Sequence, residues 1–407
     1  MDENKMTFRQ GMSLITMYLL GSSLVIAGGL AEQWDTWLSI LLAYGMTLPL
    51  AIIYARLMKL SPDGDYYDLQ LKLFGPVFGR VTAILYVWFA YHLGALVIRN
   101  FSEFIQLDSL SEQAQYLTAI PMGVLAIWCV ISGRMTLARW AAFMFPIFVI
   151  VVIVISLLST QLWQSGNLMP FLYDGFDPVL QDAFSIAAFP FAEAILLPFV
   201  LHPLRETRHA TRLWILSFTI SMAIFTLVAL RNLLVLGSEY ISTLFYPSYI
   251  AIGLINIGNF LDRLEVAIAA VFVIGGFVKI TVCLYAASLG MSKVLKMGDS
   301  RSFAAPIGIL MIVLSQFVYK NILDTYRFAF VMYKFYILPT SVAIPVILWI
   351  ICEIRRLREK KRGQTRPIQP AKRATASPPS QAQQPSAPNP GATPPPAPGD
   401  GTPATEV

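Results

Sequence analysis

The stretch AFSIAAFPFAEAILLPFVL, residues 183–201, decides the fold of this chain. It is apolar and long enough to enter a bilayer as a helix, yet Pro190 and Glu193 lie near its middle. Pro190 interrupts the helical hydrogen bonds, and a freed carbonyl group in lipid persists only against protein or a wet cavity. Since a carboxylate inside a membrane by default marks a functional site, the pattern predicts a discontinuous helix lining a small-molecule site. The alternative is a proline kink beside a buried, neutral glutamate.

The composition is that of a polytopic membrane protein. Of 407 residues, 56% are hydrophobic and only 13% are charged, whereas a soluble domain has about 25% charged residues. The net charge of +6 does not indicate nucleic-acid binding, because the basic residues lie at helix ends and at the start of the tail. The three cysteines and three histidines have no metal-ligand spacing, so we expect no metal and no cofactor. We also expect no cleavable signal peptide, because the first apolar stretch is long and no cleavage motif follows it.

A membrane-spanning helix needs about 20 apolar residues, and by that measure the chain contains ten spans. They are residues 10–30, 37–58, 77–101, 116–133, 139–161, 183–201, 212–236, 264–290, 303–320 and 330–352. The segment 238–262 contains proline, glycine and asparagine, and we interpret it as an outer loop with short helices. Its role is either a structural cap or a lid over an outer vestibule.

Lysine and arginine collect in alternate loops, which by the positive-inside rule are cytoplasmic. Both termini are therefore expected to be cytoplasmic. The loop between spans nine and ten is an exception, because it is positive on the outer side. Arg99 and Arg231 lie near the outer ends of spans three and seven, where we expect both to reach the interface and to be structural.

Ten spans divide into two groups of five, which then enter the membrane with opposite orientations. If the halves share a fold, residues 10–161 and 183–352 form an inverted repeat, and spans one and six are equivalent. Span one carries Gly21, Ser22 and Ser23 near its centre. Small residues permit unwinding and close approach of a ligand to the backbone, although close helix packing is the commoner cause.

The character of the chain changes after Cys352. Residues 353–373 are basic, and residues 374–407 are rich in proline, alanine and glutamine. We therefore divide the chain into a transmembrane domain, 1–352, and a disordered cytoplasmic tail, 353–407. The basic root of the tail should lie against anionic lipid. A partner-docking role for the proline runs is the alternative to a dispensable tail.

Several stretches together resemble one known family. They are LFGPVFGR (73–80), ALVIRNFSEFI (95–105), GRMTLAR (133–139), GNLMPFLYDGFDPVL (166–180), FPFAEAILLPFV (189–200), YPSYIAIGLINIGNFLDRLE (246–265) and GGFVKITVCLYAAS (275–288). In this order they resemble the spore-germination permeases, the membrane B subunits of nutrient germinant receptors, within the amino acid–polyamine–organocation superfamily. The resemblance covers residues 7–352. At Ala192 the family more often has glycine, which leaves less room beside Glu193 here.

The resemblance implies an all-α fold of two inverted five-helix repeats, like that of amino acid transporters, with helices one and six broken around an amino-acid-sized pocket. It also implies assembly with an A subunit and a lipoprotein C subunit in the spore inner membrane. A zwitterionic ligand needs amides for its carboxylate and carbonyls or a carboxylate for its ammonium group. The residues that we expect to supply these groups and the apolar wall are Gly21, Ser22, Ser23, Phe89, Leu93, Phe189, Phe191, Ala192 and Glu193.

Lys279 is the second charged residue whose position inside the membrane is energetically costly. It lies in the middle of span 264–290, about three helical turns from either end. A buried lysine pairs with another group, loses its proton or faces a wet cavity. In this fold, span eight packs against span one near the cation site of sodium-coupled relatives. We hypothesise that Lys279 braces the unwound part of span one or pairs with Glu193, as part of the ligand site. A purely structural ion pair is the alternative.

Three functions fit these features. The first is a nutrient-sensing receptor subunit that binds a small molecule of the amino-acid class between helices one, three, six and eight. The second is a stand-alone proton-coupled amino acid transporter, and the third is a structural membrane scaffold. No catalytic constellation is present in the sequence, so we expect no enzyme.

Overall fold

The computed structural model describes residues 5–26, 34–61, 64–108, 115–173, 175–202, 204–205, 207–255 and 264–361. Most of these residues are helical. The α-helices are α1 (Phe8–Leu20), α2 (Ser23–Ile26), α3 (Thr36–Leu60), α4 (Tyr66–Asp108), α5 (Tyr116–Ser132), α6 (Arg134–Leu158), α7 (Asp177–Ile186), α8 (Leu197–Leu201), α9 (Ala210–Leu236), α10 (Ser238–Ile241), α11 (Pro247–Gly253), α12 (Glu265–Val294), α13 (Ala304–Phe317), α14 (Ile322–Arg327), α15 (Tyr333–Leu338) and α16 (Ile344–Lys361).

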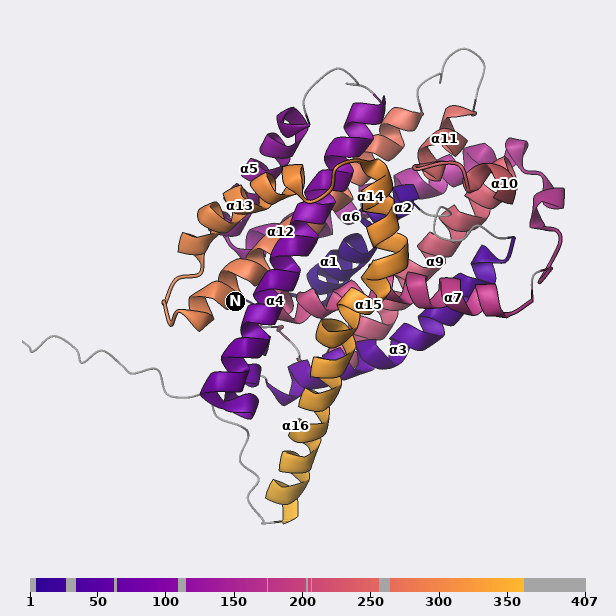
Figure 1. Cartoon of the computed structure of the whole chain (residues 1–407). Helices are drawn as coiled ribbons and strands as arrows, with labels where there is room; N and C mark the ends of the chain where they lie inside the picture. Colours follow the sequence, from indigo (N-terminus) through magenta and orange to yellow (C-terminus); the bar gives the residue numbers. More distant parts are fainter. Residues whose placement is uncertain are drawn as a thin grey trace, which may run out of the picture. The chain divides into compact units, whose positions relative to one another are not determined.

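Seven helical segments within the described ranges are long and apolar enough to cross a membrane. Two shorter apolar helical segments, Tyr116–Ser132 and Arg301–Phe317, correspond to predicted spans four and nine. The interrupted pair α1 and α2 corresponds to span one. The chain is thus an all-α polytopic membrane protein with two inverted five-helix repeats. Helix α1 packs against α6, α9 and α12 in the middle of the bundle (Figure 1).

Span one is interrupted where the sequence predicts it. A capping box starts α1, because the Gln10 side chain accepts from the Thr7 amide at 2.9 Å and Thr7 Oγ1 accepts from the Gln10 amide at 3.4 Å. The helix ends at Leu20, and Gly21 and Ser22 form a turn before α2. The prediction of a broken first helix is confirmed.

Span six is broken at its proline. After α7 the backbone forms a π-helical segment, η3 (Ala187–Phe191), and then a 3₁₀ segment, η4 (Ala192–Leu196), before α8 begins. Phe189 has φ −124° and ψ 116°, which is an extended conformation inside the span. The residue before a proline is pushed out of the helical region by the proline ring. The broken sixth helix is therefore confirmed, and Pro190 is its cause.

Span ten is irregular in a way that the sequence did not reveal. Two π-helical segments, η7 (Phe328–Met332) and η8 (Pro339–Ala343), separate α14, α15 and α16 (Figure 1). Pro339 begins η8, which accounts for the second irregularity. Helix α16 continues to Lys361. The rest of the predicted tail, 362–407, lies outside the described residues.

The predicted outer loop contains the short helices α10 and α11, and residues 256–263 of it lie outside the described residues. It is tied to three spans by hydrogen bonds. Ser248 donates a hydrogen bond to the Leu24 carbonyl at 2.5 Å and accepts one from Asn232 Nδ2 at 2.9 Å. The Tyr246 hydroxyl donates to the Asn100 carbonyl at 3.4 Å. These contacts connect α11 to α2, α9 and α4.

Candidate functional site

An ion pair between Glu193 and Lys279 lies at the centre of the bundle. Both side chains are 0% exposed. Lys279 on α12 pairs with Glu193 in the broken part of span six, and its Nζ also donates to Ser22 Oγ at 3.1 Å. Because a lone charge in a low-dielectric interior is very costly, each residue makes the other tolerable there. Lys279 therefore contacts both partners that the sequence suggested.

Two tyrosines complete the surroundings of this pair. The Tyr333 hydroxyl on α15 donates to Glu193 Oε1 at 2.5 Å, and the Tyr18 hydroxyl on α1 donates to the Glu193 carbonyl at 3.0 Å. Lys279 Nζ lies 4.7 Å from the centre of the Phe189 ring, within cation–π range. Spans one, six, eight and ten thus meet at one buried cluster of hydrogen bonds and charges.

A pocket opens directly beside Glu193. Its cavity has a volume of about 40 Å³. Its walls are mostly apolar and come from α4, the broken part of span six, Tyr319 between α13 and α14, and the segment from α14 to α15, which extends span ten back to Ile322. The lining residues are Leu93, Leu96, Val97, Asn100, Phe189, Glu193, Tyr319, Thr325, Tyr326, Phe328, Ala329, Phe330 and Tyr333. One face of the central ion pair, the Glu193 side, therefore borders this cavity.

The structure places three of the predicted site residues, Leu93, Phe189 and Glu193, on the wall of this pocket. Lys279 and Ser22 reach it only indirectly, through Glu193. A ligand-binding role for these residues remains a prediction.

Other predicted site residues make different contacts. Phe191 packs against Phe218 and Phe225 of α9, with ring centres 5.9 and 6.4 Å apart. The Ser23 hydroxyl donates to the Leu19 carbonyl at 2.7 Å within its own span. Three predicted residues remain, Gly21, Phe89 and Ala192. They are buried but do not line the pocket. Their place in a ligand site also remains a prediction.

Sequence reasoning missed the contribution of span ten. Thr325, Tyr326, Phe328, Ala329, Phe330 and Tyr333 form nearly half of the wall. The available signal was the density of aromatic residues between 326 and 336. That signal was not decisive, because aromatic residues in membrane spans are common as interfacial anchors.

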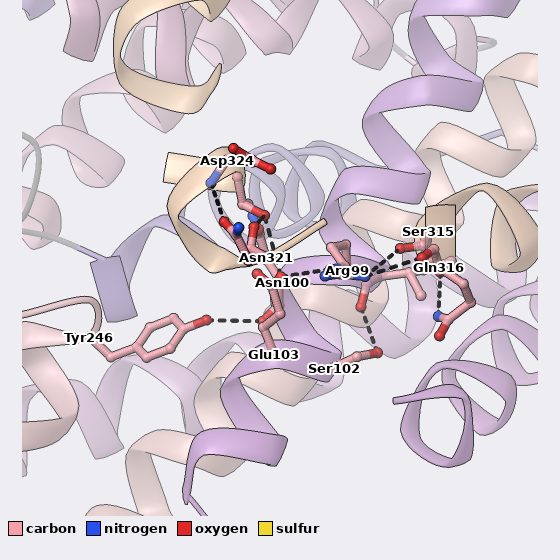
Figure 2. Close-up of polar contacts among 11 residues, drawn as sticks. Arg99, Asn100, Ser102, Glu103, Tyr246, Ser315, Gln316, Asn321 and Asp324 are labelled. Carbon is pink, nitrogen blue, oxygen red and sulfur yellow. Dashed lines mark hydrogen bonds and ion pairs between the residues drawn. The ribbon is translucent and has the colours of Figure 1, made fainter. Parts of the chain in front are cut away.

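One end of the pocket adjoins a second buried ion pair. Arg99 Nε donates to Glu103 Oε1 at 2.6 Å, and Arg99 Nη1 donates to the carbonyls of Ser315 and Gln316, each at 3.4 Å (Figure 2). Thr325 Oγ1 donates to the same Glu103 oxygen at 3.3 Å. The pair therefore ties α4 to the ends of spans nine and ten.

The expectation that Arg99 and Arg231 reach the interface is wrong. Arg99 is only 4% exposed, because the Glu103 carboxylate and helix-end carbonyls hold its guanidinium inside the bundle. Arg231 is 1% exposed, and its Nη2 donates to Asn232 Oδ1 at 2.7 Å. Glu103 balances the charge of Arg99, whereas the neutral Asn232 amide is the partner of Arg231, whose Nη1 has no hydrogen-bond partner among the described residues.

Within the described ranges no group of three or more histidine, cysteine, aspartate or glutamate side chains is placed to hold a metal ion. An apolar cavity ends at a polar cluster whose members come from both halves of the chain, which is the usual form of a small-molecule site.

Comparison with known proteins agrees with this architecture. The profile of the spore germination protein family matches residues 5–323. Spore germination protein KB of Bacillus subtilis (strain 168) is 26% identical over 370 residues, covering 89% of this chain and 99% of that protein. Spore germination protein YndE of the same organism is 24% identical over 363 residues, covering 88% and 99%.

Solved transporter structures share the fold. Mhp1, a nucleobase–cation symporter solved in a closed conformation with bromovinylhydantoin bound, aligns with a TM-score of 0.64 at 10% identity, covering 88% of this chain and 80% of that one. MhsT in complex with L-phenylalanine aligns with a TM-score of 0.56 at 14% identity, covering 84% and 97%. At these identities the likeness shows the fold alone.

Proposed function

Because this chain belongs to the spore germination protein family, we propose that it is the membrane-embedded, ligand-sensing subunit of a nutrient germinant receptor. One observation carries the proposal. Glu193 lines an apolar pocket and is bonded at the same time to Lys279 and Tyr333. A ligand that touches Glu193 thus acts on a cluster shared by spans one, six, eight and ten.

We propose a small nutrient of the amino-acid class as the ligand. The predicted contacts on spans one, three, six and eight, from Gly21–Ser23 to Lys279, belong to this proposal, together with the span-ten wall. Tyr333 and Thr325 offer polar groups, while Phe189 and Phe328 offer apolar surface. The bound L-phenylalanine of the MhsT structure is a molecule of this chemical class.

Signalling follows from a difference in affinity between conformations. A ligand that binds one arrangement of the two repeats more tightly shifts the population toward it. We propose that this shift passes to an A subunit and a lipoprotein C subunit in the spore inner membrane, with both termini of this chain cytoplasmic. No covalent chemistry is assigned to the protein in this scheme.

A thermal-shift panel of nutrients on the purified protein tests the proposal, because a ligand that binds only the folded state raises its apparent stability. Ala329→Phe fills the pocket and should abolish the shift. Val331→Phe is the matched control, since Val331 is 55% exposed and does not line the pocket. If the shift persists undiminished in Ala329→Phe, the ligand binds elsewhere.

The alternative is a stand-alone proton-coupled amino acid transporter, which the transporter fold favours. In that case Glu193 or Lys279 carries the proton. Uptake of labelled amino acids into vesicles that contain only this protein would support transport. A retained germination response in Ala329→Phe would instead favour a scaffold.

A further inference from the structure

A second hollow lies next to the pocket and shares one residue with it. This open groove has a volume of about 640 Å³, and its lining includes Arg99, Gln115, Gln316 and Lys320. Tyr319 lines both the groove and the pocket. The two spaces therefore meet at this side chain.

The partition between the two spaces has a fixed part. Arg99 faces the groove, and the next residue, Asn100, faces the pocket. Glu103 holds Arg99 from one turn further along α4 and accepts a hydrogen bond from Thr325, which lines the pocket (Figure 2). Charge-assisted hydrogen bonds are stronger than hydrogen bonds between neutral groups. The Arg99–Glu103 side of the wall between groove and pocket is therefore rigidly held.

Tyr319 is held differently. Its hydroxyl oxygen is buried and has no hydrogen-bond partner among the described residues. Its ring packs against Phe328 with centres 5.6 Å apart. Only packing contacts thus fix the side chain, and turning it aside breaks no described hydrogen bond.

The groove and the pocket differ in chemistry. The groove presents glutamine amides, which both donate and accept hydrogen bonds, and the ammonium of Lys320, which forms no ion pair within the described part of the chain. The charge of Arg99 is balanced by Glu103, so the described lining carries an excess positive charge from Lys320. Such a surface attracts a carboxylate, whereas the pocket behind it suits an apolar body.

We propose that the groove is the access vestibule of the pocket, that it captures the carboxylate of an amphipathic ligand, and that Tyr319 is the side chain that must turn aside for passage. This assignment rests on the proposed ligand-binding function only for the identity of the ligand. The route itself is a property of the ligand-free protein and is tested without a nutrient.

Thiol labelling of Val97→Cys measures the route. Val97 lines the pocket and is 2% exposed, while the native Cys129, Cys283 and Cys352 are buried, so wild-type protein supplies the background. In detergent, Tyr319→Ala in this background should raise the labelling rate roughly tenfold, as expected when a minor open state becomes the major one. Tyr319→Phe should leave the rate near its starting value, and Tyr319→Trp should lower it.

Tyr326→Ala is the matched control, because Tyr326 also lines the pocket but not the groove. An unchanged rate in Tyr319→Ala, or an equal rise in Tyr326→Ala, would overturn the assignment. Thermal unfolding of each variant separates access from loss of the fold.

Charge selection is measured with an anionic sulfonatoethyl and a cationic trimethylammonioethyl methanethiosulfonate reagent, each normalised to a free thiol. The anionic reagent should label Val97→Cys faster, and Lys320→Gln should remove that preference. A preference unaltered by Lys320→Gln would contradict carboxylate capture. If labelling follows the expected pattern but no nutrient shifts the unfolding temperature, the receptor function is rejected and the access route stands. If a nutrient shifts the unfolding temperature but labelling does not follow the pattern, only the access route is rejected.

Discussion

Gly21 and Gly275 lie against each other so closely that a methyl group on either would overlap the backbone of the other. The turn in span one therefore rests on span eight backbone to backbone, one helical turn from Lys279. The contact explains why small residues occur at the interruption. Gly21 thus allows close helix packing, while the next residue, Ser22, is hydrogen-bonded to Lys279 of the candidate site. Close packing and a place beside the ligand site are therefore compatible.

Gly275→Ala should destabilise the protein by about 1–3 kcal/mol, the usual cost of overpacking a well-packed interior. Gly276→Ala is the control, because a methyl group there meets nothing within 4 Å and alanine favours a helix over glycine by about 1 kcal/mol. Thermal unfolding of the two variants in the same detergent measures the difference. Equal midpoints would show that the Gly21–Gly275 contact is not tight.

Breaking the central ion pair should cost more than removing it altogether. Glu193→Gln leaves Lys279 buried without a counter-charge, and a loss of about 3–5 kcal/mol is expected for such a change. The double variant Glu193→Gln with Lys279→Met should recover much of this loss, because no buried charge remains. Glu239→Gln, at an exposed site, should be neutral. Denaturant unfolding of all four proteins checks the order, and an additive double variant would contradict the pairing.

Tyr333→Phe tests the link between span ten and the break in span six. Removing the hydroxyl deletes a hydrogen bond to a carboxylate, which is typically worth about 1.5–3 kcal/mol. Tyr319→Phe removes a hydroxyl that makes no described hydrogen bond and should change stability little. Comparable unfolding midpoints for both variants would argue against the Tyr333–Glu193 bond.

Ser248→Ala should loosen the outer loop. Ser248 joins Asn232 of α9 to the Leu24 carbonyl of α2, and leaving such buried groups unsatisfied costs about 1–3 kcal/mol. Faster amide hydrogen exchange is expected in Pro247–Gly253 and Ser23–Ile26. The exposed Ser242→Ala, whose hydroxyl bonds only to the Glu239 carbonyl, should leave exchange unchanged there.

The contact between Glu193 and Lys279 could be predicted from the sequence for a physical reason. Charges deep in membrane spans are rare and must find partners, so two such residues in one chain constrain each other strongly. The breaks at Gly21 and Pro190 were equally accessible, because small residues and proline act on the backbone locally.

The shape of the pocket could not be predicted from the sequence in the same way. Phe191 faces α9 because the backbone passes from π to 3₁₀ geometry around Pro190, and this change of pitch rotates every later side chain. The π turn at Phe328–Met332 likewise places Phe328 and Tyr333 beside the pocket without a proline or glycine to announce it. Arg99 lies inside because Glu103 is within reach, a pairing that a hydropathy count does not weigh.

The complete burial of Glu193 and Lys279 limits how the protein can move. Drawing span six away from span eight would strand two opposite charges in a medium that cannot solvate them. While both groups are charged, these two spans are therefore expected to move as a single body, and the freedom to rearrange falls to their neighbours, above all the twice-interrupted span ten.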